Sequence, residues 1–170
     1  MESSPSKYLL LDPYDFDQGD SGWRELDEKK QFLKAAQVIE QYLELNRGKV
    51  EEYDKENPGF ASIMVFHAGQ LYATAGPKYY KTAEPFFELS LRDHDEPWNQ
   101  YVKGTVAFLN NDLEALNRYL VALRQGDPKH VRVQVLERLV KGLRQGITYE
   151  KAYDGKFMLQ PRRPRRLASS

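Results

Sequence analysis

Helix-breaking segments recur at a regular interval along this sequence. The segments Asn57-Pro58-Gly59, Asp93-His94-Asp95-Glu96-Pro97 and Gly126-Asp127-Pro128 combine turn-forming residues with proline, and their prolines lie 39 and 31 residues apart. A period of roughly 20 to 50 residues is typical of repeat proteins, in which one helical hairpin buries its apolar face only against a neighbouring hairpin. The spacing therefore predicts antiparallel helical hairpins that stack in series as a short solenoid.

The residues between these breaks follow a helical rather than a strand pattern. Leu113, Leu116, Leu120 and Leu123 recur at intervals of three and four, which places them on one face of a helix. Leucine outnumbers isoleucine by 20 to 3, and this balance favours helices over strands. We expect an all-α fold of about seven helices: a long first helix over 23–47, then helices over 60–75, 79–92, 98–110, 113–125, 129–145 and 148–153.

The two ends of the chain differ from this helical body, which we expect to span residues 23–155. Residues 1–22 mix Ser, Asp, Gly and Pro around Leu9-Leu10-Leu11, and we expect an irregular arm that lays these leucines on the body. Residues 156–170 contain too few apolar side chains to order themselves, so we expect a disordered basic tail. The long helix over 23–47 would cap the apolar face of the first hairpin.

Two successive units of the chain share a pattern of small, aromatic and proline residues. The first unit has Ala68-Gly69, Tyr72, Ala83, Phe87, Ser90 and Pro97, and the second has Trp98 or Tyr101, Gly104, Ala107, Leu116, Leu120, Leu123 and Pro128. In this pattern the stretch 58–153 resembles the tetratricopeptide repeat family, although it has two extra residues at Gly76-Pro77 and a leucine at 116 where that family has alanine. A seven-helix bundle around one axis has the same spacings and is the alternative fold.

The resemblance implies a protein–protein interaction module whose partner lies along the inner face of each unit's first helix. Carried over by the registers of Gly69 and Gly104, it assigns partner-facing positions to Phe66, Gln70, Tyr101, Thr105 and Phe108. The implied function is a non-enzymatic adaptor or scaffold that binds a protein or a peptide. An alternative occupant of the same groove is the leucine segment of the N-terminal arm.

The residue inventory argues against an enzyme, a metal site or a bound cofactor. The absence of cysteine excludes disulfides, thiol catalysis and thiolate zinc sites. His67 lies within a helical pattern, His94 lies in an acidic turn without the spacing of a calcium loop, and His130 opens a helix. The sequence has no phosphate-binding glycine loop and no serine-nucleophile motif. We therefore expect structural roles for all three histidines.

Charge is balanced over the whole chain but separated along it. Residues 1–60 carry a net charge of −6 and residues 129–170 carry +8, although the total is zero. Arg162, Arg163, Arg165 and Arg166 make the tail a candidate for contacts with phosphates or acidic proteins. Nucleic-acid binding through this region is an alternative function that the near-neutral pI of 6.8 does not favour.

A small helical protein that neutralises a toxin or an enzyme is the other alternative, because the chain is short, charge-polarised and rich in aromatic residues. The longest apolar runs are far shorter than the about 20 residues needed to cross a bilayer, and the first residues show no basic and apolar signal pattern. We therefore expect a soluble cytoplasmic protein without membrane contact. The sequence predicts neither the oligomeric state nor the identity of the partner.

Overall fold

Every regular element in the described part of the chain is a helix, which confirms the all-α prediction. The computed structural model describes residues 6–159. Eleven α-helices and two short 3-10 helices run along these residues. They are α1 (Ser6–Leu9), α2 (Pro13–Asp17), α3 (Arg24–Glu28), α4 (Phe32–Leu45), α5 (Arg47–Glu56), α6 (Phe60–Ala75), η1 (Pro77–Tyr79), α7 (Tyr80–Leu89), α8 (Glu96–Leu109), α9 (Leu113–Gly126), α10 (Val131–Arg144), α11 (Tyr149–Asp154) and η2 (Lys156–Leu159).

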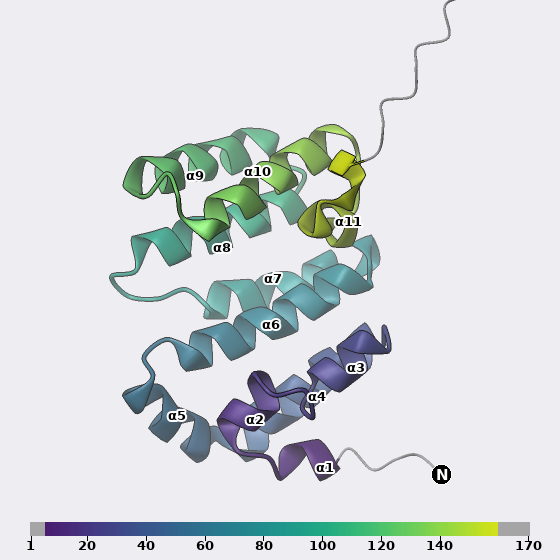
Figure 1. Ribbon diagram of the computed structural model, residues 1–170, viewed down its shortest axis with the longest axis vertical. Helices are drawn as coiled ribbons and strands as arrows, with labels where there is room; N and C mark the ends of the chain where they lie inside the picture. The colour runs from purple at the N-terminus through teal and green to yellow at the C-terminus, as the bar shows by residue number, and fades with distance from the viewer. Residues whose placement is uncertain (1–5, 160–170) are drawn as a thin grey trace, which may run out of the picture.

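The longer helices form pairs that follow one another in space (Figure 1). Helix α6 packs against α7, α8 against α9, and α10 against α11, while α4 lies against α6 and α7 lies against α8. Figure 1 shows these pairs as successive layers, from α4 and α5 at one end of the molecule to α9 and α10 at the other. The expected helix over 60–75 coincides with α6. Pro58 and Pro128 lie just before helices, and Pro97 is the second residue of α8.

An aromatic cluster forms the middle of the core, where α6, α7 and α8 meet. The centre of the Phe66 ring lies 5.0 Å from that of Phe87, 5.1 Å from that of Trp98 and 5.2 Å from that of Tyr101. Gly69 faces the same cluster, because a β-carbon at this position would lie 3.0 Å from the Phe87 ring. The missing side chain therefore allows α7 to approach α6 closely.

Gly142 on α10 makes a similar close approach to α11. A β-carbon at Gly142 would lie 2.5 Å from the β-carbon of Ala152, which has no flexible side chain that can move aside. We therefore expect Gly142→Ala to lower the free energy of unfolding, measured by urea denaturation, by about 1–3 kcal/mol. Gly48→Ala on α5 is the matched control, because nothing lies within 4 Å of its β-carbon position. An equal loss in both variants would contradict this packing.

The prediction of a single helix over residues 23–47 is wrong. The chain instead forms α3, turns, forms α4, and continues after Asn46 as α5. In the first turn Lys30 adopts a left-handed backbone with φ of 57°, and the Gln31 amide donates to the Leu26 carbonyl at 2.9 Å. This turn redirects the chain so that apolar side chains on both sides of it pack on the core. The free energy gained by burying that apolar surface is larger than the helix propensity that favours one continuous helix.

The N-terminal arm, expected to be irregular, contains two short helices, α1 and α2, in its described part. The Tyr42 hydroxyl donates to the Leu11 carbonyl at 2.7 Å, and the Asn46 amide donates to the Leu9 carbonyl at 3.1 Å. Phe16 stacks on Tyr42 with ring centroids 3.8 Å apart. The leucine segment therefore lies on α4, so the alternative in which it fills a groove along α6 and α8 is wrong.

The expected disordered tail begins with an ordered turn, because η2 occupies residues 156–159. Residues 160–170, which include Arg162, Arg163, Arg165 and Arg166, lie outside the described residues. Between residues 6 and 159, no helix combines the length and the apolar content needed to cross a membrane.

Candidate functional site

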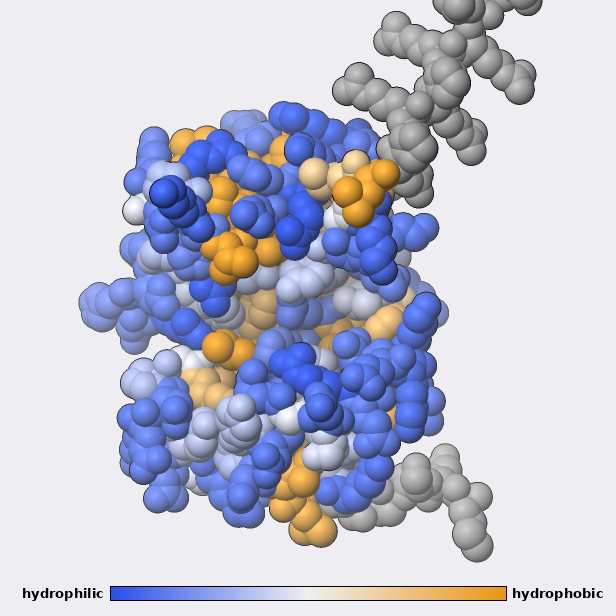
Figure 2. All heavy atoms as spheres, in the orientation of Figure 1, coloured by the Kyte–Doolittle hydropathy of each residue, from blue (hydrophilic) through white to orange (hydrophobic). Residues whose placement is uncertain are grey.

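A groove runs along α6, between α3 on one side and α10 and α11 on the other. It consists of two adjoining hollows of about 390 and 350 Å³ that share Arg24, His67, Gln70 and Tyr153. In Figure 2 the molecule is hollowed across its middle, where white and orange residues lie among hydrophilic ones. We call the two hollows together the α6 groove.

A buried carboxylate anchors one wall of the α6 groove. Asp17 is fully buried and accepts hydrogen bonds from the Trp23 indole at 3.0 Å and from the Gln18 amide at 2.6 Å. Its Oδ1 also lies 2.9 Å from Nδ1 of His67 on α6. Burial acts to raise the pKa of Asp17, but the hydrogen bond and charge of His67 and the bonds from Trp23 and Gln18 outweigh it and hold the pKa below 3.8. The network ties the segment before α3 to α6.

The turn that brings Trp23 next to Asp17 depends on glycine. A β-carbon at Gly22 would overlap the carbonyl oxygen of Phe16, so the backbone can approach itself here only without a side chain. This close approach folds residues 17–23 back on themselves, and the indole then reaches a carboxylate six residues earlier in the chain. The contact between Trp23 and Asp17 is therefore local in sequence, whereas the contact between Asp17 and His67 of α6 joins distant parts of the chain.

Two arginines line the smaller hollow, and each lies over an aromatic ring. The guanidinium carbon of Arg24 lies 4.4 Å from the centre of the Trp23 ring. The guanidinium carbon of Arg132 lies 4.9 Å from the centre of the Trp98 ring and 5.6 Å from that of Tyr101. Both arginines are half-buried, and neither takes part in an ion pair within the described residues.

The larger hollow carries acidic rather than basic residues along most of its edge. Its charged lining consists of Arg24 and Lys30 together with Asp27, Glu28, Glu150 and Asp154. Burial raises the pKa of Asp27, and the charges of Arg24 and His67 only partly offset this effect. The charge of the α6 groove is therefore uneven: both arginines line the smaller hollow, whereas the carboxylates line only the larger one, together with Arg24 and Lys30.

Four of the five predicted partner-facing residues belong to the core. Phe66, Tyr101, Thr105 and Phe108 are only 3%, 4%, 0% and 3% exposed, so the structure places them in the core rather than on an open surface. The physical reason is size, since the aromatic rings of α6 and α8 are large enough to fill the space between these helices. Phe66 and Tyr101 still contribute to the lining of the smaller hollow. Gln70 is half-buried and lies where the two hollows join.

Sequence reasoning missed the residues that give the α6 groove its charge and its fixed wall. Asp17 and His67 are 50 residues apart in the chain, and no motif of fixed spacing connects them. Arg24 and Arg132 come from opposite ends of the helical body, in α3 and α10. The only local signal is the arginine that directly follows Trp23, which offers a ring and a guanidinium side by side.

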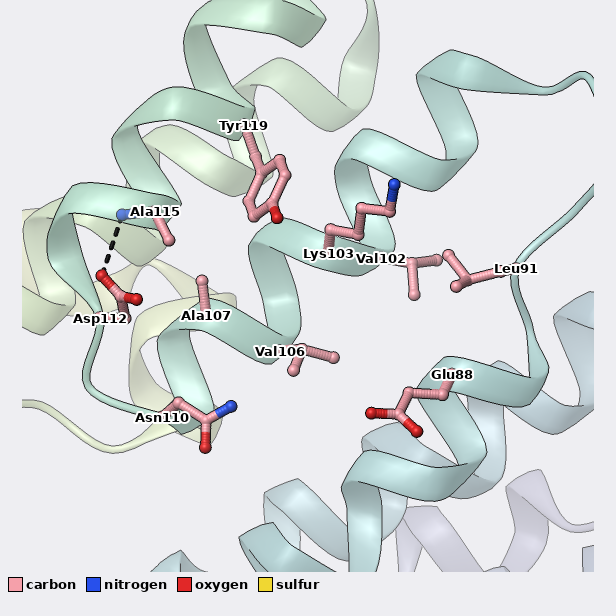
Figure 3. A pocket seen from close by; sticks show the side chains of 10 residues that line it. All are labelled: Glu88, Leu91, Val102, Lys103, Val106, Ala107, Asn110, Asp112, Ala115 and Tyr119. Atoms are coloured by element: carbon pink, nitrogen blue, oxygen red, sulfur yellow. Dashed lines mark hydrogen bonds between the residues drawn. The ribbon is translucent and has the colours of Figure 1, made fainter.

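A third hollow, of about 520 Å³, lies on α7, α8 and α9 (Figure 3). Figure 3 shows Val102 and Val106 of α8 near its centre, with Glu88 of α7 and Lys103 of α8 on different sides. The hollow thus combines an apolar floor with charges of opposite sign. None of the residues that the sequence assigns to a partner lines it.

The remaining histidines take part in local structure. His130 Nδ1 accepts a hydrogen bond from the Arg132 amide at 3.1 Å and so caps α10. His94 adopts a left-handed backbone, with φ of 62°, in the turn before α8. In the part of the chain that the structure describes, no three His, Asp or Glu side chains come together as metal ligands.

The chain matches no protein-family model, no curated protein and no solved structure.

Proposed function

We propose that this chain is a non-enzymatic adaptor that binds an extended segment of a partner protein in the α6 groove. The observation that carries the proposal is the groove itself, in which half-buried arginines lie over aromatic rings at one hollow and carboxylates edge the other. Aromatic and arginine side chains in partly desolvated hollows dominate the energetics of protein recognition. The layered helix pairs support a tetratricopeptide-like repeat as the scaffold of this groove.

The Asp17–His67 pair supports a binding role better than a catalytic one. In hydrolases an aspartate orients a histidine that takes a proton from a hydroxyl or thiol nucleophile in hydrogen-bond contact with it. Within residues 6–159, the one side-chain hydrogen bond of His67 goes to Asp17. The ring of His67 lies instead beside that of Trp23, with centroids 5.1 Å apart. We therefore assign the pair the role of holding the wall of the groove in place.

Selection from a library of random displayed peptides tests the proposal. We expect peptides enriched on the full chain to bind Gln70→Trp about tenfold more weakly or worse, because an indole at the junction of the two hollows fills the groove. Lys103→Trp, at the hollow on α7, α8 and α9, is the matched control and should bind these peptides with unchanged affinity. A selection that enriches no peptide, or only peptides sensitive to Lys103→Trp, would contradict binding in the α6 groove.

A further inference from the structure

Arg24 and Arg132 reach one hollow of the α6 groove from independent parts of the fold. Arg24 is fixed on its side because its Nε donates to the Asp17 carbonyl at 2.9 Å while its guanidinium stacks on Trp23. Arg132 belongs to the first turn of α10, where the ring of Trp98 supports it. Both guanidinium groups are therefore held near the hollow before a partner arrives, which lowers the entropy cost of binding.

These two arginines interact electrostatically with Asp27 and Asp95, respectively, but at more than ion-pair distance. Neither forms an ion pair in the described stretch 6–159, whereas Arg92, which also lies over the Trp98 ring, pairs with Asp95 at 3.0 Å. The carboxylate of Asp17, in the adjoining wall, is fully buried and already bonded within that wall. Two half-buried positive charges that line one hollow create a positive potential that attracts an anion.

We propose that the smaller hollow binds an acidic side chain of the partner segment, with its carboxylate between Arg24 and Arg132. This inference rests on the proposed peptide-binding function of the α6 groove. Guanidinium groups hold carboxylates through paired N–H donors, and these hydrogen bonds strengthen where water is partly excluded. The rest of the segment continues into the larger hollow, where Asp27 and Glu150 favour a lysine or arginine.

A carboxylate suits this site better than a phosphate group, because an acidic residue adjoins it. Asp27 and Arg24 both line the larger hollow, and the charge of Arg24 partly offsets the effect of burial on the pKa of Asp27. A phosphate carries a charge of about −1.5 to −2 at neutral pH, so Asp27 repels it more strongly than it repels a carboxylate. The segment that fits is therefore acidic rather than phosphorylated.

Peptide selection on the full chain, with and without the two arginines, tests this inference. We expect the enriched peptides to share an Asp or Glu, and synthetic C-terminally amidated copies to lose about tenfold or more in affinity when that residue becomes Asn or Gln. Arg24→Gln/Arg132→Gln should cause the same loss, and the change in the peptide should then have no further effect. The control Arg47→Gln/Arg144→Gln removes the same charge from two exposed positions and should change affinity less than about twofold.

The outcomes distinguish this inference from the proposed function. Selection that enriches no peptide rejects the function and the inference together. Enriched peptides that share no acidic residue, or that bind Arg24→Gln/Arg132→Gln unchanged, reject the inference and leave peptide binding in place. A phosphoserine peptide that binds more tightly than its glutamate form overturns the choice of a carboxylate. Where the double variant melts at a lower temperature, Arg132→Gln alone repeats the test with the contact between Arg24 and Asp17 intact.

Discussion

Asp17→Ala should lower the free energy of unfolding by about 3 kcal/mol or more. The substitution leaves the buried indole N–H of Trp23 without its acceptor and removes the partner of His67. Urea denaturation at neutral pH measures the loss. Asp15→Ala is the matched control, because Asp15 is an exposed residue of the same short helix, α2, and its removal should change the stability by less than about 0.5 kcal/mol. Similar losses in the two variants would contradict the anchoring role of Asp17.

The same carboxylate makes the stability depend on pH in a defined direction. The pKa of Asp17 in the folded chain lies below 3.8, so the folded state takes up this proton less readily than the unfolded state. The contribution of Asp17 to stability is therefore complete above the unfolded pKa, about 3.9, and is lost as the pH falls through the lower folded pKa. The stability difference between the unchanged chain and Asp17→Asn should shrink over this acid range. A difference that stays constant there would contradict the lowered pKa.

Phe66→Ala should cost about 3–5 kcal/mol of unfolding free energy, because the Phe66 ring contacts three others at the centre of the core. Gln70→Ala, one turn further along α6, should cost only about 1 kcal/mol, since it removes one hydrogen bond to the Tyr149 hydroxyl. Urea denaturation of both variants gives the comparison. A larger loss at Gln70 than at Phe66 would reverse the assignment of Phe66 to the core.

The helix pairs of the second half could be predicted because their signals are local. Leu116, Leu120 and Leu123 are buried at the spacing that the sequence indicates, and the Asp112 side chain accepts from a backbone amide at the start of α9. The turn between α3 and α4 has no such signal, because Lys30 takes a left-handed backbone where glycine or asparagine is usual. Packing of the residues on both sides of the turn compensates for this backbone strain. Because residue propensities describe only local conformation, they do not predict this turn.

The α6 groove could be predicted only in its location, along the first helix of a pair. The repeat register points to Phe66 and Tyr101, but the volume of their rings places them between α6 and α8 rather than at an open surface. Arg24 and Arg132 become neighbours of one hollow only because α3 and α10 lie on either side of α6. Apolar periodicity predicts the buried face of a single helix, so it does not predict which side chains of distant helices lie close together.

Both tryptophans of the chain lie beneath the arginines of the α6 groove. Trp23 and Trp98 are buried, and guanidinium groups lie 4.4 and 4.9 Å from the centres of their rings. An anion drawn between these groups changes the electric field at both indoles, and the wavelength of indole emission follows the local field. The unmodified chain therefore carries its own optical reporter, and its intrinsic fluorescence should shift as the groove fills, without any attached dye.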